Sequence, residues 1–341
     1  MKQVILTLLT IILLPLHTFA TEAERVLLIG NSYTYCNDLP GVLMALSEQT
    51  DRPLHVESYT VGGMSLRGFL NSPEHARARQ MLESGDFDWV ILQDQSQTPA
   101  YRPDDTLSAV RRWAEIAAAA DTRVVLFLTW AHAYKDKGKL QLRSDMQQRT
   151  GSTYCRAAVR HNAAVAPVGE AWAAWYRKHP DTPLHVQDGS HPNPCGTYLA
   201  ACVIHGTISG KAPKNLPGTL RLDSRPLISI PASTAAELQS AAAYTLKHFT
   251  PARYLAKEEE READLLSVET VRREITRGTH ISDLIRLAGK PIYTATHGGQ
   301  HIYQFRIRGG KELCAYCSSR GIIEQLSIAS PGSMAEIIDL R

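Results

Sequence analysis

The sequence has little excess charge of either sign, and this limits the partners that it can bind. Its 37 Lys and Arg residues against 34 Asp and Glu residues give a formal net charge of +3 over 341 residues. No basic stripe stands out, which argues against nucleic acid as a partner. Internal repeats and low-complexity segments are absent, and the hydrophobic fraction of 44% is ordinary. The composition therefore predicts a folded globular protein with a sizeable core.

Long apolar runs are also scarce, apart from one at the start of the chain. Lys2 precedes an apolar run over residues 4–16, and Thr18-Phe19-Ala20 places small residues at positions −3 and −1 of a cleavage site. This pattern is typical of a signal peptide over residues 1–20. A retained N-terminal anchor is the alternative, but the run is short for a membrane span and no cysteine follows to accept a lipid. We expect an exported protein, periplasmic or secreted, with no transmembrane segment after cleavage and a charge of +2 once Lys2 is removed.

Cysteines are few but even in number, which in an exported chain suggests disulfides, with fifteen possible pairings. Cys36 lies four residues after Ser32 and Cys195 four residues after His191, so these two could pair if Ser32 and His191 meet in space. Cys314-Ala-Tyr-Cys317 predicts a local disulfide or two free thiols. Half a zinc site is the alternative, but no second Cys/His pair with suitable spacing accompanies it. The six cysteines are Cys36, Cys155, Cys195, Cys202, Cys314 and Cys317.

Short apolar runs alternate with helical segments from residue 25 to about 210. This alternation predicts a parallel sheet with helices on both faces. Because ligands bind where loops leave the carboxyl ends of such strands, we expect the residues that follow the strands to converge on one edge. The expected strands are 25–29, 54–61, 88–92, 123–129 and 163–168, and the expected helices are 39–49, 76–83, 106–120, 145–161 and 195–208.

The rest of the chain predicts a second, smaller unit. Residues 211–235 are rich in proline and are expected to be a surface connector, followed by a helix over 236–249. The charge run 258–262 predicts a solvated helix face or linker, so we place a linker at 251–267 between a larger domain over 21–250 and a module over 268–341. The module is expected to be α+β, with two short helices and strands at about 301–307, 312–317 and 322–328.

Two short motifs could carry chemistry. Gly30-Asn31-Ser32 follows the first expected strand, and Asp188-Gly189-Ser190-His191 precedes a helix. A serine hydroxyl is a poor nucleophile until a base takes its proton, and a carboxylate can orient that base. The alternatives are a turn with a helix cap for Ser32 and a surface Asx turn for Asp188. A dinucleotide loop is less favoured because Gly30 lacks the later glycines, and a metal site at His191 lacks a nearby partner.

The two motifs resemble the SGNH/GDSL-type hydrolases, in particular the subgroup with Gly-Asn-Ser-Tyr/Phe-Thr after the first strand. The chain has Gly30-Asn31-Ser32-Tyr33-Thr34, then Val61-Gly62-Gly63-Met64-Ser65-Leu66, and Asp188-Gly189-Ser190-His191-Pro192-Asn193 as the family's Asp-x-x-His. The resemblance covers about residues 25–210 and implies a flavodoxin-like three-layer α/β/α sheet. It implies Ser32 as nucleophile, His191 as base and Asp188 as orienting acid. The backbone N–H groups of Ser32 and Gly63 would stabilise an oxyanion, and no metal or organic cofactor is implied.

The sequence departs from the family at the third block. Where Gly-x-Asn-Asp is usual, it has Leu92-Gln93-Asp94-Gln95-Ser96-Gln97, and a glutamine amide can donate to an oxyanion as asparagine does. We favour Gln95, with Gln93 second. Trp130, after the fourth strand, lines the substrate pocket or is structural. The other histidines, such as His132, His179 and His185, are expected at the surface.

In the module, residues 275–291, ending in the turn Gly289-Lys290-Pro291, resemble the small outer-membrane assembly lipoproteins (SmpA/OmlA, BamE type). This resemblance implies an interaction module with an envelope protein as partner. The whole sequence predicts an exported serine esterase acting on a small acyl ester or an acylated saccharide. The alternative is a non-catalytic envelope protein that uses the same scaffold to bind carbohydrate.

Overall fold

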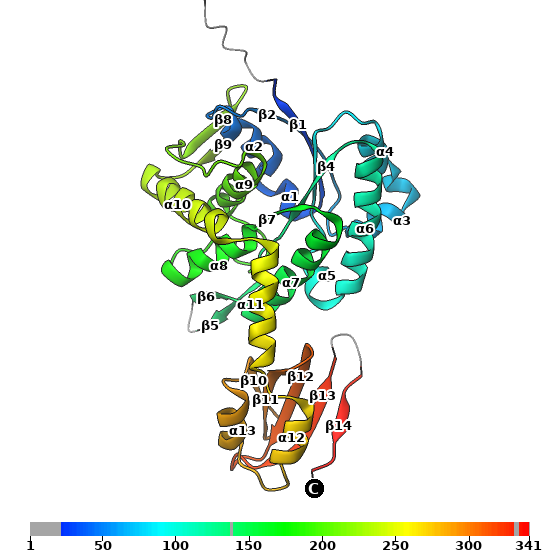
Figure 1. The fold of residues 1–341 in the computed structure, drawn as a ribbon. Coiled ribbons are helices and arrows are strands. Elements are labelled where there is room, and N and C mark those ends of the chain that lie inside the picture. Colours follow the sequence, from blue (N-terminus) through cyan, green and yellow to red (C-terminus); the bar gives the residue numbers. More distant parts are fainter. Residues whose placement is uncertain (1–21, 137–138, 331–333, 341) are drawn as a thin grey trace, which may run out of the picture.

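The computed structural model of the protein describes residues 22–136, 139–330 and 334–340. These residues form a larger N-terminal domain and a smaller C-terminal domain, with helix α11 (Pro251–Ala263) running between them (Figure 1). The predicted signal peptide lies outside the described residues. In the part of the chain that is described, no helix is long and apolar enough to span a bilayer.

The N-terminal domain is built on a five-stranded parallel sheet in the order β2-β1-β3-β4-β7. The strands are rich in Val, Ile and Leu because both faces of the sheet are covered, and Val26 to Ile29 in the central strand are at most 1% exposed. This is the flavodoxin-like order, so the predicted three-layer fold is confirmed. The strands are β1 (Glu24–Gly30), β2 (Leu54–Thr60), β3 (Trp89–Leu92), β4 (Arg123–Phe127) and β7 (Ala164–Ala166).

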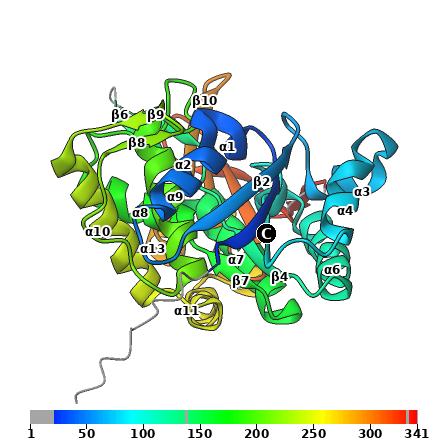
Figure 2. The same ribbon diagram turned by 90° about the horizontal axis from the view of Figure 1, so that it is seen from above.

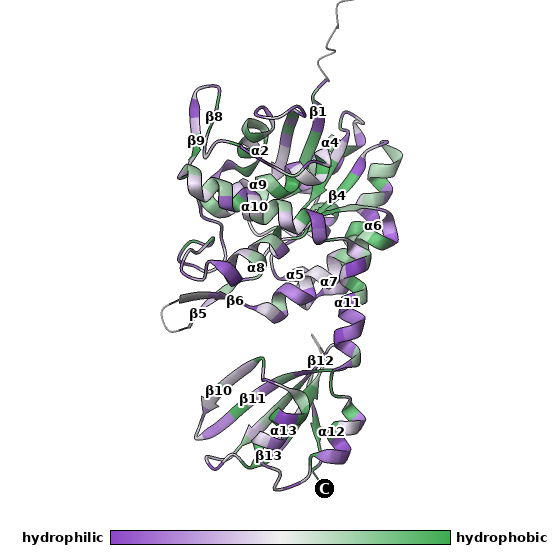
Figure 3. Ribbon diagram, turned by 60° about the vertical axis from the view of Figure 1, so that its left-hand side comes forward, coloured by the Kyte–Doolittle hydropathy of each residue, from purple (hydrophilic) through white to green (hydrophobic). Residues whose placement is uncertain are grey.

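Helices cover both faces of this sheet, and each layer has its own apolar core. Figure 2 shows the two layers on opposite sides of the strands, and in Figure 3 the hydrophobic residues concentrate in strands such as β4. One layer consists of α2 (Leu39–Ser47), α8 (Val168–Lys178), α9 (Pro194–Ser209) and α10 (Ala232–His248). The other consists of α3 (Leu66–Asn71), α4 (Ala76–Glu83), α6 (Pro103–Ala119) and α7 (Ser144–His161).

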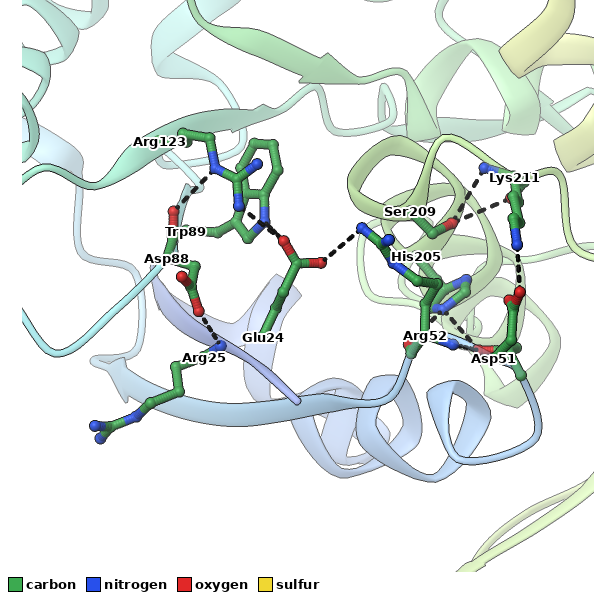
Figure 4. Close-up of polar contacts among 11 residues, drawn as sticks. Glu24, Arg25, Asp51, Arg52, Asp88, Trp89, Arg123, His205, Ser209 and Lys211 are labelled. Atoms are coloured by element: carbon green, nitrogen blue, oxygen red, sulfur yellow. Dashed lines mark hydrogen bonds and ion pairs between the residues drawn. The ribbon is translucent and has the colours of Figure 1, made fainter. Parts of the chain in front are cut away.

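Polar contacts tie the amino ends of the strands together (Figure 4). The Glu24 carboxylate lies 2.7 Å from Arg123 and 3.4 Å from Arg52, and it accepts a hydrogen bond of 3.1 Å from the Trp89 indole. The Arg123 guanidinium also lies over the Trp89 ring. Pairs as exposed as these contribute at most about 1 kcal/mol each. This edge therefore fastens β1, β3 and β4 and leaves the opposite, carboxyl edge for chemistry.

Several elements were not expected from the sequence. The predicted connector 211–235 contains a hairpin of β8 (Thr219–Leu222) and β9 (Arg225–Ser229). Its two turn residues, Asp223 and Ser224, both have positive φ, as a tight hairpin turn requires. Helix α8 was also missed, as were a second hairpin and a single-turn helix. These are β5 (Ala133–Asp136), β6 (Lys139–Leu142) and α5 (Thr98–Tyr101), whereas α1 (Ser32–Tyr35) lies where a turn with a helix cap was considered after the first strand.

The C-terminal domain is a small α+β unit, as predicted, with a five-stranded antiparallel sheet and its own core. Phe305, Leu313 and Leu326 in the sheet and Val271 and Leu284 in the helices are completely buried. Its elements are α12 (Val268–Glu274), α13 (Ile281–Ala288), β10 (Tyr293–His297), β11 (Gln300–Ile307), β12 (Lys311–Cys317), β13 (Ile323–Ala329) and β14 (Glu336–Ile338).

The charge run 258–262 belongs to helix α11, which packs on α7, and it is not uniformly solvated. Glu258 is 8% exposed and accepts a hydrogen bond of 2.6 Å from the Ser152 hydroxyl. Arg306 of the C-terminal domain lies 2.9 Å from Glu262 and 3.7 Å from Glu258. The expectation of a solvated face is therefore wrong for Glu258, because the inward side of α11 holds both domains through ion pairs.

The prediction of disulfides is wrong, because all six cysteines are free thiols. Cys36 and Cys195 follow Ser32 and His191 in sequence, but neither spacing fixes the direction of the thiol. Cys314 and Cys317 lie three residues apart on strand β12, and side chains at that spacing point to opposite faces of a sheet. A local disulfide is therefore excluded by the strand, and no group of three metal-binding side chains occurs among the described residues.

Candidate active site

Ser32 lies at the carboxyl edge of the sheet, directly after the central strand β1. Asn31 caps the single-turn helix α1 by accepting a hydrogen bond of 3.1 Å from the Tyr33 amide, so Ser32 is its first residue. Gly30 is needed just before this turn. A Cβ atom there would lie 2.5 Å from Gln93 Oε1 and closer still to Thr34 Oγ1. One turn of helix has a small dipole, so local N–H groups matter more here than the helix as a whole.

The structure brings Ser32, His191 and Asp188 together in one hydrogen-bonded series. Ser32 Oγ lies 2.9 Å from His191 Nε2, and His191 Nδ1 lies 2.6 Å from Asp188 Oδ2. The Asp188 carboxylate also accepts hydrogen bonds of 2.8 and 2.9 Å from the amides of Ser190 and His191. A base between a hydroxyl and a carboxylate is the arrangement that activates a serine nucleophile.

Asp188 is set to remain ionised. Burial opposes its charge, but the hydrogen bonds from the His191 ring and from the Ser190 and His191 amides outweigh it and lower the pKa of the carboxyl. The loop that carries Asp188 is closed by an antiparallel bridge between His185 and Pro192. An ionised carboxylate on a closed loop holds the imidazole in one tautomer, with Nε2 free to accept a proton from Ser32.

Two backbone N–H groups remain available beside Ser32. No described residue accepts a hydrogen bond from the amide of Ser32 or of Gly63. Gly63 is exposed and has a φ of 68°, which a residue with a side chain adopts at a cost. A hollow of about 520 Å³ adjoins it, and its lining is mostly polar: Gly63, Gln95, Gln97, Thr98, Tyr101 and Arg102. The geometry suits stabilisation of a developing negative charge by backbone donors.

The two candidate glutamines occupy different places. Gln93 is 1% exposed, and its carbonyl accepts hydrogen bonds from the Asn31 amide and the Thr34 hydroxyl, while its amide donates to the Asp94 carbonyl. Gln93 therefore holds the turn before Ser32, and its side chain is buried. Gln95 lines the hollow beside Gly63, and its carbonyl accepts from the amides of Gln97 and Thr98 while its amide donates a hydrogen bond of 3.2 Å to Ser96. Of the two, only Gln95 is partly exposed and lines the hollow.

Sequence reasoning missed two residues that align the loops of the site. Asn31 is 2% exposed, and its amide donates to the Met64 carbonyl at 2.9 Å, which joins Ser32 to the loop that carries Gly63. Asp94 is 1% exposed and accepts from the amides of Leu66 and Gln95 and from the Thr106 hydroxyl. Burial raises the pKa of Asp94. A lone acidic residue just after a buried strand was the signal that could have indicated this role.

Trp130 is only 1% exposed, and it does not line the hollow beside Gly63. Its ring is stacked between Tyr33, at 4.6 Å, and Trp172, at 4.0 Å, and its indole donates to the Ser190 carbonyl at 2.9 Å. The structural alternative therefore holds for Trp130. Its position supports both Tyr33, next to the nucleophile, and Ser190, between Asp188 and His191.

The expectation that the other histidines lie at the surface is wrong for His185 and His132. His185 is 2% exposed, and its ring lies 2.7 Å from the Tyr176 hydroxyl and 3.1 Å from the Ala131 carbonyl. His132 is half-buried, with Nε2 3.2 Å from Ser96 Oγ and 3.3 Å from Ser190 Oγ. Both rings brace the loop that carries the Asp/His pair.

Comparison with known proteins supports the fold. No protein-family profile and no curated protein matches the chain. Among solved structures, a DUF4886 family protein from Bacteroides uniformis matches with a TM-score of 0.52 and 17% identity over 67% of this chain and 96% of that one. A protein from Slackia heliotrinireducens described as a candidate SGNH hydrolase matches with a TM-score of 0.47 and 30% identity over 55% of this chain and 99% of that one.

An acetylxylan esterase from Geobacillus stearothermophilus also matches, with a TM-score of 0.42 and 15% identity over 54% of this chain and 94% of that one. The resemblance of residues 275–291 to outer-membrane assembly lipoproteins stays a prediction. The match with a TM-score of 0.52 agrees with the sheet order and the two helical layers described above. The N-terminal domain therefore has a flavodoxin-like three-layer α/β/α fold, with a serine, a histidine and an aspartate hydrogen-bonded in series at the carboxyl edge of its sheet.

Proposed function

We propose that the protein is an exported serine esterase that removes acyl groups, acetyl above all, from a hydroxylated substrate such as an acylated saccharide. One observation carries the catalytic part of this proposal: the continuous series from Ser32 Oγ through the His191 ring to the Asp188 carboxylate. A helix cap would use only the Ser32 hydroxyl, and a surface turn would use only the Asp188 carboxylate. Neither of these structural roles requires the His191 imidazole between the two groups.

In the proposed reaction, Ser32 Oγ attacks the ester carbonyl while His191 Nε2 takes its proton. The amides of Ser32 and Gly63, with the Gln95 side chain, stabilise the oxyanion. The tetrahedral intermediate then breaks its bond to the alcohol, which leaves with the proton from His191. Water, deprotonated by the same ring, attacks the acyl-enzyme and releases the acid together with free Ser32.

The choice of a small acyl group on a polar alcohol has physical support. The hollow beside Gly63 is lined by Gln95, Gln97, Thr98 and Arg102, which offer hydrogen bonds, and by Tyr101, which adds one aromatic ring. A long acyl chain gains affinity from apolar walls, whereas a polar alcohol gains it from such donors and acceptors. The proposal of export rests on the first twenty residues, which resemble a signal peptide. The proposal of an acetylated saccharide as substrate rests on the family resemblance.

The test is hydrolysis of p-nitrophenyl acetate and of acetylated xylo-oligosaccharides by the mature protein. Ser32→Ala should lower kcat by several orders of magnitude, and Ser233→Ala, at an exposed position on α10, should leave it unchanged. Equal rates for the parent and Ser32→Ala would overturn the esterase and favour a binding protein on this scaffold. Retention of the melting temperature in Ser32→Ala shows that a loss of rate is chemical.

A further inference from the structure

A second concave surface lies on the N-terminal domain, away from Ser32. Three hollows of about 560, 350 and 550 Å³ lie along α8: the first lies against α10, the second against α10 and α11, and the third against α7 and α11. Arg177 lines all three, so they form one elongated groove. Neither the triad residues nor Gly63 and Gln95 line it. We call this surface the basic groove and define it by six of its residues: Arg177, Lys178, Tyr244, Arg253, Lys257 and Arg261.

The groove exists because the facing sides of two helices carry small residues. On α8, Ala173 and Ala174 follow Glu170 on the side that lines the hollows. On α10, Ala236, Ser240 and Ala241 lie one to two turns apart and line the same space. Longer side chains in these places would fill the gap between the helices, so the sequence keeps it open.

The groove has an unbalanced positive charge. Arg253, Lys257 and Arg261 follow each other at four-residue spacing, which places them on one face of α11. No direct hydrogen bond or ion pair joins these three side chains or Arg177 to another residue in the described part of the chain, but the charges of Arg177 and Arg261 act on the carboxyl of Glu170. Exposed arginines elsewhere, such as Arg123 and Arg225, do pair with carboxylates. Glu170 is one carboxylate against four cations, so the cations still repel each other, and binding an anion relieves that repulsion.

Two acidic residues line the groove and do not neutralise it. Glu170 receives a hydrogen bond of 3.1 Å from Gln147, and burial raises the pKa of its carboxyl. Glu237 lies 3.8 Å from the ring of His179 at the far end. Glu259 and Glu260 belong to the same helix as the cations but are not lining residues. The cations therefore outnumber the carboxylates along the whole groove.

An exposed aromatic ring lies among these cations. Tyr244 is 56% exposed, its ring packs at 4.3 Å against that of His248, and Lys178 lies 5.7 Å above it. Tyr244 lines two of the three hollows. A flat, supported ring can pack against the apolar face of a sugar ring, while arginine binds carboxylate or sulfate groups through paired hydrogen bonds.

We propose that the basic groove binds a chain of an anionic polysaccharide, separately from any chemistry at Ser32. The elongated, concave shape fits a linear chain better than a flat membrane surface, and the spacing of the cations along α11 fits charges that repeat along that chain. This proposal goes beyond the esterase activity and does not depend on it. Such a site would hold one part of a polymer on the protein while another part of the same polymer reaches a catalytic centre.

The test measures binding of a fluorescein-labelled oligogalacturonide of ten residues to the full chain carrying Ser32→Ala, by fluorescence anisotropy at low and at physiological salt. Neutral cellohexaose is the uncharged competitor. We expect the double variant Arg177→Gln/Arg261→Gln to bind about tenfold more weakly. Arg77→Gln/Arg112→Gln, which removes two exposed cations from α4 and α6, should bind within about twofold of the parent. Tyr244→Ala should weaken binding and leave its dependence on salt unchanged.

Equal weakening by both double variants would overturn the proposal, because it would show attraction to the net charge of the protein alone. Competition by cellohexaose as strong as that by unlabelled oligogalacturonide would also overturn it. All substituted side chains are at the surface, so unchanged melting temperatures are expected. Because Ser32→Ala is the background, the result is independent of whether the protein hydrolyses esters.

Discussion

Replacement of Asn31 should damage both the stability of the N-terminal domain and the alignment of the site. Its side-chain oxygen caps helix α1, and its side-chain amide donates to the Met64 carbonyl on the loop before Leu66. Loss of a cap costs about 1 kcal/mol. Loss of a buried donor that leaves a carbonyl without a partner costs about 1–3 kcal/mol. The free energy of unfolding should therefore fall by about 2–4 kcal/mol in Asn31→Ala.

Calorimetry can separate the two contributions. In a domain of this size 1 kcal/mol corresponds to about 2–4 °C in melting temperature, so Asn31→Ala should lower it by roughly 4–16 °C. Asn31→Ser keeps a capping oxygen but has no amide that reaches Met64, so its loss should be smaller. Both variants should lose about 10²-fold in kcat, because the loop that carries Gly63 is no longer tied to Ser32.

Asn71→Ala provides the matched control. Asn71 is exposed at the end of α3, and its loss should change neither the melting temperature nor kcat. If Asn31→Ala melted within about 1 °C of the parent and retained full kcat, the Asn31 side chain would neither stabilise the domain nor align the loop of Gly63, and the reasoning would be refuted.

Three further predictions concern residues around the site. Burial holds the pKa of His185 at about 4, below the value of about 6.5 in the unfolded chain. The free energy of unfolding should therefore fall as the pH drops from 6.5 to 4, because the unfolded chain binds the proton more readily. In His185→Gln this pH-dependent loss should be smaller by about 3 kcal/mol, measured by urea unfolding at pH 7 and pH 4. Gln95→Ala should lower kcat about 10²-fold. Both Gln95→Ala and Gln93→Ala should lower the melting temperature, because the Gln95 carbonyl accepts from the Gln97 and Thr98 amides and the Gln93 carbonyl accepts from the Asn31 amide and the Thr34 hydroxyl. A larger loss of kcat in Gln93→Ala than in Gln95→Ala would exchange the two roles. Thiol titration of the unreduced, unfolded protein should detect six free cysteines, and a count of four would indicate a disulfide.

The sheet and the convergence of polar residues at its carboxyl edge could be predicted because simple physical rules determine both. Runs of Val, Ile and Leu mark strands that are buried on two faces, and parallel strands bring their carboxyl ends to one edge. In the register of the sheet, Ile29 pairs with Leu92 and Gly30 with Thr60, so the residues that follow β1, β2 and β3 meet at that edge. The sequence therefore predicts that Ser32, Gly63 and the glutamines come close together.

Other features depend on contacts among distant segments, which local patterns do not specify. Trp130 is buried because Tyr33 and Trp172, from two other segments, stack on its two faces. The sequence of α11 predicts a linker because its inward face is polar. The partners of Glu258, which are Ser152, Arg156 and Arg306, all come from other segments of the chain. The preference for Gln95 over Gln93 becomes clear only when the hydrogen bonds of the Gln93 side chain are known.

The most direct test of the catalytic claim is covalent labelling with a fluorophosphonate, followed by peptide mapping. The reagent reacts only with a serine whose hydroxyl has been activated by a base. We predict a single adduct on Ser32, formed at least ~10²-fold more slowly in a folded His191→Ala variant. An adduct on a different serine, or labelling of Ser32 at the same rate without the His191 ring, would contradict this prediction.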